Sequence, residues 1–283
     1  MASLVVSSMA TAAAFAILMV LGGQLFGSDA GLWATIALAV YPMSVFLIAP
    51  FTESLFLALT LAAVLLAYRK SWLPTGAFAL LASLSRGPGM LLSIPLALLA
   101  WRDWSFEPGR KSVCKAVSLL AAVAAPLAGG LGFLGWRSWA GFPSMNATVL
   151  RYAGTAFVDP VTGVTAAIRQ WLTVLDLPTT LDLAAGALLI GMTVAMLIVP
   201  RWRKPELLAY MLANAVFLLS RRTEGASSLK SLSRYTVVLF PAFLVVGEWL
   251  GRARRWTRFV YLAVSSAVLL AMSALYSLWF FLG

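Results

Sequence analysis

The chain has 283 residues, of which 61% are hydrophobic and 11% are charged. A soluble domain carries about 25% charged residues, so this composition excludes an ordinary water-soluble protein and indicates an integral membrane protein. The net charge of +11 comes from short basic clusters between apolar runs, which is typical of membrane-facing loops and not of a nucleic-acid-binding surface. The sequence has no histidine, which excludes a serine–histidine pair and leaves carboxylates as the main acid–base candidates.

Eight apolar runs approach the length of about 20 residues that a membrane-spanning helix requires. They predict an all-α, polytopic helical bundle of about eight spans that forms a single transmembrane domain over residues 1–283. In chain order the runs are Leu4–Gly22, Gly31–Ala49, Phe51–Tyr68, Ala116–Trp136, Leu183–Val199, Glu206–Leu219, Tyr235–Leu250 and Phe259–Leu282.

A ninth apolar run, Trp72–Trp101, is interrupted by Ser85–Gly89, which reads SRGPG. Adjacent glycine and proline break a helix, and irregular backbone at membrane depth is tolerated where it is buried in protein or lines a cavity. We therefore expect two short helices that meet at Ser85–Gly89, as a tight hairpin or a re-entrant loop.

Charge predicts the orientation of the bundle, because basic clusters concentrate on the cytoplasmic side. If the chain turns back at Ser85–Gly89, it crosses the membrane an even number of times between the first and second basic clusters. All four basic clusters can then lie on the cytoplasmic side. The remaining connections, Ala49–Glu53, Ser85–Gly89, Arg137–Asp182 and Ser220–Arg234, are then predicted on the outer side. The four basic clusters are Arg69 and Lys70; Arg102, Arg110, Lys111 and Lys115; Arg201, Arg203 and Lys204; and Arg252, Arg254, Arg255 and Arg258.

Two charged residues at breaks between apolar helices are candidates for function. Glu53 follows Ala49–Thr52, and Arg86 lies in the break of the ninth run. A charge near the membrane core costs a few kcal/mol and indicates function by default. The alternatives are a helix-terminal acid favoured by the helix dipole for Glu53, and a snorkelling cation or a partner of Glu53 for Arg86.

The segment Ser220–Arg234 is basic although we expect it on the outer side, where the charge rule disfavours such a cluster. Guanidinium groups match phosphate oxygens, so a phosphate site at the interface would explain the cluster. The alternative is that this loop is cytoplasmic. Its cations are Arg221, Arg222, Lys230 and Arg234.

The long outer segment Arg137–Asp182 contains Asp159 and Asp176, together with tryptophans that suit an interfacial helix or belt. Asp159 is a candidate catalytic carboxylate. The alternative is that both acids belong to a plain structured loop.

Three blocks of the sequence share a family pattern. They are Tyr41–Phe56 (YPMSVFLIAPFTESLF), Ala82–Gly89 (ASLSRGPG) and Ser233–Pro241 (SRYTVVLFP). In this order they resemble the PIG-V-like mannosyltransferases, relatives of the second mannosyltransferase of glycosylphosphatidylinositol-anchor synthesis. The resemblance covers about residues 15–250.

The resemblance implies a GT-C fold and a glycosyltransferase that takes a sugar from a polyprenyl-phosphate donor, with its active site facing away from the cytoplasm. Glu53, Arg86, Arg234 and Tyr235 fall on motif positions. Arg86, Arg221, Arg222 and Arg234 are the expected ligands of the phosphate, and Glu53 and Asp159 are the candidate bases. No metal site is assigned, and the sequence does not indicate a cofactor.

The family pattern also contains an earlier helix and an outer loop with a Trp-Asp motif, whose acid is the expected base. This motif has no counterpart in the sequence, where Arg102–Trp104 reads RDW in an expected cytoplasmic turn. We therefore expect a truncated, divergent or inactive member of the family.

The expected partners are the membrane, a polyprenyl-phosphate-linked sugar donor and a lipid or glycan acceptor, without nucleic acid. The expected location is the plasma membrane in a prokaryote or the endoplasmic reticulum in a eukaryote. The alternative function is a non-enzymatic lipid or solute transporter, because broken helices also occur in transporters. A transporter of that kind has two similar halves, whereas this sequence has one broken element without a counterpart.

Overall fold

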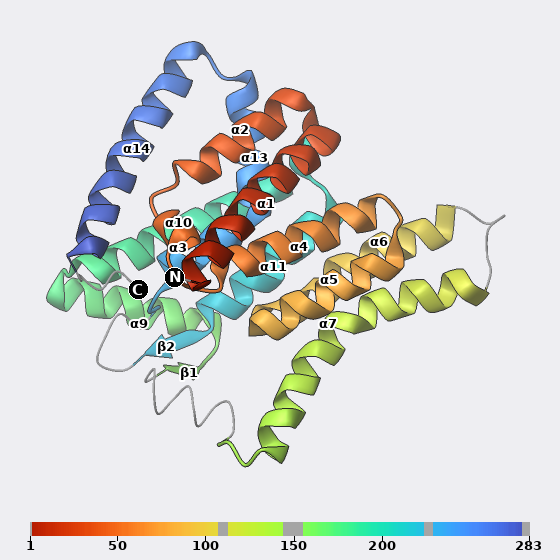
Figure 1. Ribbon diagram of the computed structural model, residues 1–283. Coiled ribbons are helices and arrows are strands. Elements are labelled where there is room, and N and C mark those ends of the chain that lie inside the picture. Colours follow the sequence, from red (N-terminus) through yellow and green to blue (C-terminus); the bar gives the residue numbers. More distant parts are fainter. Residues whose placement is uncertain (1, 107–112, 144–154, 224–228, 279–283) are drawn as a thin grey trace.

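The computed structural model describes residues 2–106, 113–143, 155–223 and 229–278 (Figure 1). In these residues the chain is a helical bundle with one small two-stranded sheet, so the all-α prediction is confirmed apart from that sheet. The α-helices are α1 (Ala2–Phe26), α2 (Ser28–Ala39), α3 (Val45–Ile48), α4 (Glu53–Tyr68), α5 (Trp72–Ser85), α6 (Ser93–Phe106), α7 (Val113–Trp139), α9 (Pro160–Val174), α10 (Leu177–Ile198), α11 (Pro205–Leu219), α12 (Leu232–Tyr235), α13 (Phe240–Arg252) and α14 (Arg255–Ser277).

Short 3₁₀ helices and two strands complete the fold. The 3₁₀ helices are η1 (Gly87–Leu92), η3 (Pro200–Trp202) and η4 (Thr236–Val238), and the strands are β1 (Thr155–Phe157) and β2 (Arg221–Thr223). β1 and β2 are antiparallel, with Phe157 opposite Arg221. The predicted outer segments 137–182 and 220–234 therefore meet at one end of the bundle.

Four helices in the described part of the chain are long and apolar enough to cross a membrane: α1, α7, α10 and α14. A fifth candidate is the pair formed by Leu232–Val238 and Phe240–Arg252, which is bent by 70°. The chain is therefore a multi-pass membrane protein, but the prediction of eight spans is not confirmed.

The remaining expected spans are too short or are broken. Glu53–Tyr68 has 16 residues, which extend about 24 Å against a hydrocarbon core of about 30 Å. Pro205–Leu219 is shorter still. The expected span Gly31–Ala49 separates into α2 and α3 around Pro42, because proline removes a backbone donor and clashes with the preceding turn.

The break predicted within Trp72–Trp101 is present. α5 ends at Ser85 and α6 begins at Ser93 after η1. The Trp72 indole nitrogen donates to Asp103 over 2.8 Å, and the Lys70 ammonium lies 3.4 Å from the same carboxylate. Because these contacts join the start of α5 to the end of α6, the two helices form the predicted hairpin.

Small residues allow the helices α2 and α13 to pack closely against each other. A Cβ added to Gly247 of α13 would lie 2.4 Å from the Ala34 nitrogen of α2, so only glycine allows this contact between the two helices. Small residues serve the same purpose in membrane bundles generally, since lipid tails provide no hydrophobic drive for association.

The four basic clusters gather at one end of the bundle, through three acids that join them. Asp103 lies 3.4 Å from both Lys70 and Lys115, and Arg102 lies 3.3 Å from Glu206. Glu248 pairs with Arg201 at 3.4 Å and with Arg252. Arg110 and Lys111 lie outside the described residues. The predicted grouping of the clusters on one side is consistent with these pairs.

Labelling of single cysteines tests which end faces the cytoplasm. In a Cys114→Ser background, we expect Lys204→Cys to react only from the cytoplasmic side and Thr173→Cys, in α9, only from the outer side. Ser227 would be the sequence-based choice but lies outside the described residues, whereas Thr173 is exposed. Reaction of both cysteines from the same side would contradict the predicted orientation.

Candidate functional site

The candidate site lies at the end of the bundle opposite the acid-linked basic clusters and centres on Glu53, the first residue of α4. Its carboxylate is fully buried, and Oε1 lies 2.6 Å from both the Arg86 Nη1 and the Arg234 Nε atoms. The two arginine side chains are 13% and 16% exposed. An uncompensated buried charge is costly, so each arginine depends on this carboxylate for its position.

Arg86 reaches Glu53 because the chain is extended at the end of α5. Arg86 has φ −154° and ψ 139°, and its carbonyl accepts a hydrogen bond from the Gly89 nitrogen over 2.9 Å. A Cβ on Gly89 would lie 2.4 Å from the Ser83 Cα, so glycine is required for this tight turn. The broken sequence Ser85–Gly89 therefore serves to direct Arg86 toward Glu53.

Arg234 is positioned by a second buried acid, Asp182 of α10. Asp182 Oδ1 accepts hydrogen bonds of 2.9 Å from both the backbone nitrogen and the hydroxyl of Ser233. Ser233 precedes Arg234 on α12, so Asp182 fixes this short helix against α10. Sequence reasoning missed this role, although a buried acid at the start of an expected span is a signal for function.

Aromatic rings hold the guanidinium groups by cation–π contacts. Arg234 lies 3.9 Å from the ring centre of Phe51 and 5.1 Å from that of Phe46. Arg86 and Arg221 both lie 4.9 Å from the ring centre of Tyr235. These contacts bring the predicted phosphate ligands Arg86, Arg221 and Arg234 into one group with Tyr235.

We call Glu53, Arg86, Arg221, Arg234 and Tyr235 the arginine cluster. Two of its guanidinium groups, those of Arg86 and Arg234, contact the Glu53 carboxylate, and the third, that of Arg221, contacts the Tyr235 ring. Within this cluster, three positive charges and one negative charge leave two positive charges in excess. The backbone of Arg222 lies in β2, next to Arg221, but the structure does not describe its side chain. Lys230 is partly buried and follows the undescribed residues 224–228. An excess of positive charge held by rigid partners suits an anion.

Asp159 stands apart from the arginine cluster in its contacts. It is exposed and caps α9, accepting a hydrogen bond of 2.9 Å from the Thr162 nitrogen. Hydrogen bonds with the side chain and backbone of Thr162 hold the pKa of the Asp159 carboxyl below its ordinary value. The contacts that the structure describes for Asp159 are those of a helix cap, and none of them joins Asp159 to the arginine cluster. Asp176 caps α10 in the same way.

The second oxygen of Glu53 is the group best placed to accept a further hydrogen bond. Glu53 Oε2 is buried and has no hydrogen-bond partner among the residues that the structure describes. A buried acceptor without a partner is costly, so this oxygen is available to a ligand that offers a hydrogen-bond donor.

Comparison of the chain with family models, with curated proteins and with solved structures gave no match.

Proposed function

We propose that this chain is a membrane glycosyltransferase of the GT-C type, which transfers a sugar from a polyprenyl-phosphate carrier to a lipid or glycan acceptor on the non-cytoplasmic side. Its resemblance to PIG-V-like enzymes favours mannose as the sugar. The observation that carries the proposal is the meeting of Glu53, Arg86 and Arg234, which come from three separate sequence blocks and are joined by contacts of 2.6 Å.

The charge of the arginine cluster supports a phosphate ligand. In the proposed reaction an acceptor hydroxyl attacks the anomeric carbon, the bond between that carbon and the phosphate oxygen breaks, and the phosphate leaves with the polyprenyl chain. The two excess positive charges would stabilise the negative charge that develops on the phosphate. A guanidinium can also bind two phosphate oxygens at once, which fixes the donor in one orientation.

The proton of the acceptor hydroxyl has to go to a base. Glu53 is the candidate in this chain, because its Oε2 atom is buried and without a hydrogen-bond partner in the described residues. Its Oε1 atom is meanwhile engaged by Arg86 and Arg234. Glu53 would therefore have two roles, since one oxygen would orient the arginines and the other would accept from the substrate.

Ligand binding to the purified protein in nanodiscs tests the proposed donor class. We expect mannosyl polyprenyl phosphate to bind at least about tenfold more tightly than the water-soluble donor GDP-mannose, because only the former offers a single phosphate attached to a membrane-embedded chain. Tighter binding of GDP-mannose would contradict the proposal. Movement of lipid or solute across vesicles without sugar transfer would favour the transporter alternative.

A further inference from the structure

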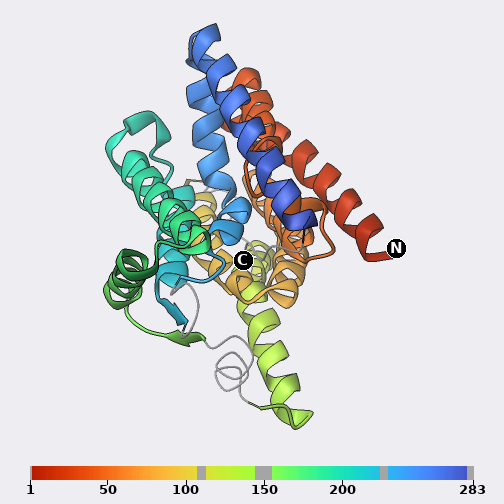
Figure 2. The ribbon, with the colours of Figure 1, turned by 90° about the vertical axis from the view of Figure 1, so that its left-hand side faces the viewer.

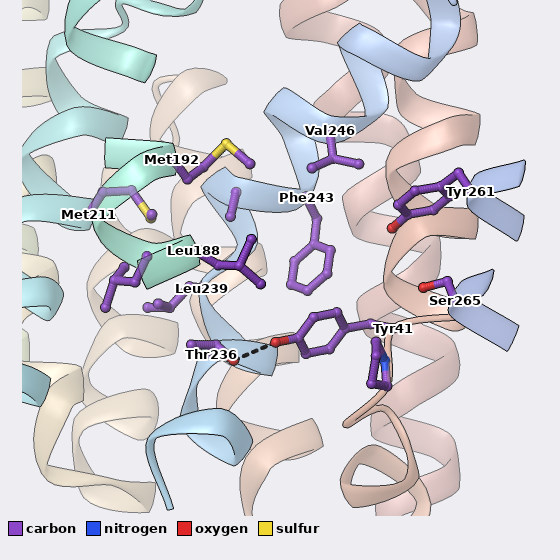
Figure 3. A pocket seen from close by; sticks show the side chains of 13 residues that line it. Tyr41, Leu188, Met192, Met211, Thr236, Leu239, Phe243, Val246, Tyr261 and Ser265 are labelled. Carbon is purple, nitrogen blue, oxygen red and sulfur yellow. Dashed lines mark hydrogen bonds between the residues drawn. The ribbon is translucent and has the colours of Figure 1, made fainter. Parts of the chain in front are cut away.

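A mainly apolar pocket of about 280 Å³ lies between α10, α13 and α14 (Figure 3). We call it the α13–α14 pocket. Tyr261 and Ser265 of α14 point into it from one side, and Leu188 and Met192 of α10 line the other. This volume is at the lower limit of about 300–1,000 Å³ for small-molecule sites, so the pocket suits part of a larger molecule.

The α13 wall of the pocket is apolar. Ala242, Phe243 and Val246 line it, and these three residues lie within about one turn of the helix. Leu239 also lines the pocket and lies just before α13, at the bend that follows η4. The apolar lining therefore continues from this bend into the first turns of α13.

Two of the hydroxyl groups at the pocket are hydrogen-bonded to each other. The Tyr41 hydroxyl and the Thr236 hydroxyl lie 2.7 Å apart (Figure 3). Because these hydroxyl groups satisfy each other, they do not require a polar ligand. Phe243 packs edge-on against the Tyr41 ring, with 5.3 Å between the ring centres. An apolar occupant is therefore favoured.

The pocket borders the lipid on one side, because α14 lies along the outside of the bundle (Figure 2). Almost none of the apolar residues of α14 are buried in the described structure. α14 contacts the bundle at both ends. Arg258 donates hydrogen bonds to the carbonyl oxygens of Leu250 and Gly251, and the Tyr276 ring lies 5.4 Å from that of Phe46. A membrane-embedded chain can thus reach the pocket beside α14 without crossing water.

The other end of the pocket adjoins the arginine cluster. Thr236 lines the pocket and directly follows Tyr235, so their Cα atoms are separated by about 3.8 Å. Phe46, which packs against Tyr276 of α14, also contacts the Arg234 guanidinium at 5.1 Å. The arginine cluster, with two positive charges in excess, therefore lies next to one end of an apolar pocket, an arrangement that matches a lipid chain with an anionic head.

We propose that the α13–α14 pocket binds the phosphate-proximal isoprene units of a polyprenyl phosphate while its phosphate contacts Arg234. This inference rests on the proposed function and specifies which part of the molecule recognises the lipid of the donor. Methionines at the wall, Met192 and Met211, are flexible and polarisable, and they can adjust to the methyl branches of a prenyl chain.

Filling the pocket tests the proposal. We expect Ser265→Phe to weaken the binding of mannosyl polyprenyl phosphate about tenfold, because the ring displaces isoprene carbons that would otherwise be buried. Ala263→Phe, on an exposed position of the same helix, should leave binding unchanged. Val246→Trp fills the pocket from the α13 wall and should reproduce the loss if Ser265→Phe fails to fold. Unchanged affinity in a folded pocket-filling variant would overturn the proposal.

Two further probes separate this proposal from the proposed function. Water-soluble mannosyl phosphate should be bound equally by wild type and Ser265→Phe but less well by Arg234→Ala. A photoreactive decaprenyl phosphate without sugar should label α13 and α14, and excess phosphatidylglycerol should not compete. Labelling of these helices without binding of either mannosyl compound would support the pocket and contradict the transferase. Full competition by phosphatidylglycerol, or no labelling, would overturn the pocket assignment.

Discussion

Replacing Glu53 with alanine is expected to destabilise the protein by about 3–5 kcal/mol, because removal of one partner from a buried ion pair leaves its charge uncompensated. Here two arginine side chains, 13% and 16% exposed, would lose the same carboxylate. Asp29→Ala is the matched control, since Asp29 is an exposed acid in the first turn of α2. Thermal unfolding of the purified variants in detergent measures the difference.

The double change distinguishes a true network from two separate effects. If Glu53 and Arg86 depend on each other, Glu53→Ala combined with Arg86→Ala should cost less than the sum of the single changes, by about 0.5–3 kcal/mol. Glu53→Gln should be intermediate, since an amide can accept a hydrogen bond but carries no charge. Additive losses, or a Glu53→Ala melting temperature equal to that of Asp29→Ala, would show that the pair does not stabilise the fold.

The break at Ser85–Gly89 and the segregation of charge could be predicted because both depend on local composition. Proline and glycine interrupt a helix wherever they occur, and basic clusters mark the ends of apolar runs. The sequence also allowed the prediction that Arg86 is a partner of Glu53, because both are charged residues at breaks between apolar helices. The structure supports that alternative without removing the functional one.

The number of spans could not be predicted reliably from apolar length. Short apolar helices such as α4 and α11 are buried by protein neighbours, so hydropathy alone does not separate them from complete spans. Pro42 and Pro50 lie inside or beside expected spans, and the chain bends there into α3. The length of the hydrophobic runs alone therefore does not determine the number of spans.

The contacts of Arg234 depend on positions far apart in the chain. Arg234 and Glu53 are separated by 181 residues, and Ser233 and Asp182 by 51. No local pattern encodes which of several cations reaches a given acid, because that choice depends on how the helices pack. The family resemblance placed Glu53, Arg86 and Arg234 on motif positions, and the structure brings these three together.

Arg234→Ala is expected to weaken the binding of mannosyl polyprenyl phosphate by about tenfold to a hundredfold, the range that corresponds to a charged hydrogen bond of about 1.5–3 kcal/mol. Arg234 combines partial exposure with fixed contacts to Glu53 and Phe51, so its guanidinium is held in place before the phosphate arrives. A group that is already ordered loses less entropy on binding.

Arg255→Ala and Arg234→Lys separate a phosphate site from general positive charge. Arg255 is exposed at the start of α14, among the basic clusters at the opposite end of the bundle, and its loss should leave affinity nearly unchanged. Arg234→Lys should recover only part of the affinity, because an ammonium cannot bind two phosphate oxygens in the planar geometry of a guanidinium. Donor binding in nanodiscs is measured for each variant, with thermal unfolding to confirm that it folds. Equal affinity of wild type and a folded Arg234→Ala would contradict the phosphate site, and full recovery by lysine would reduce the role of Arg234 to its charge.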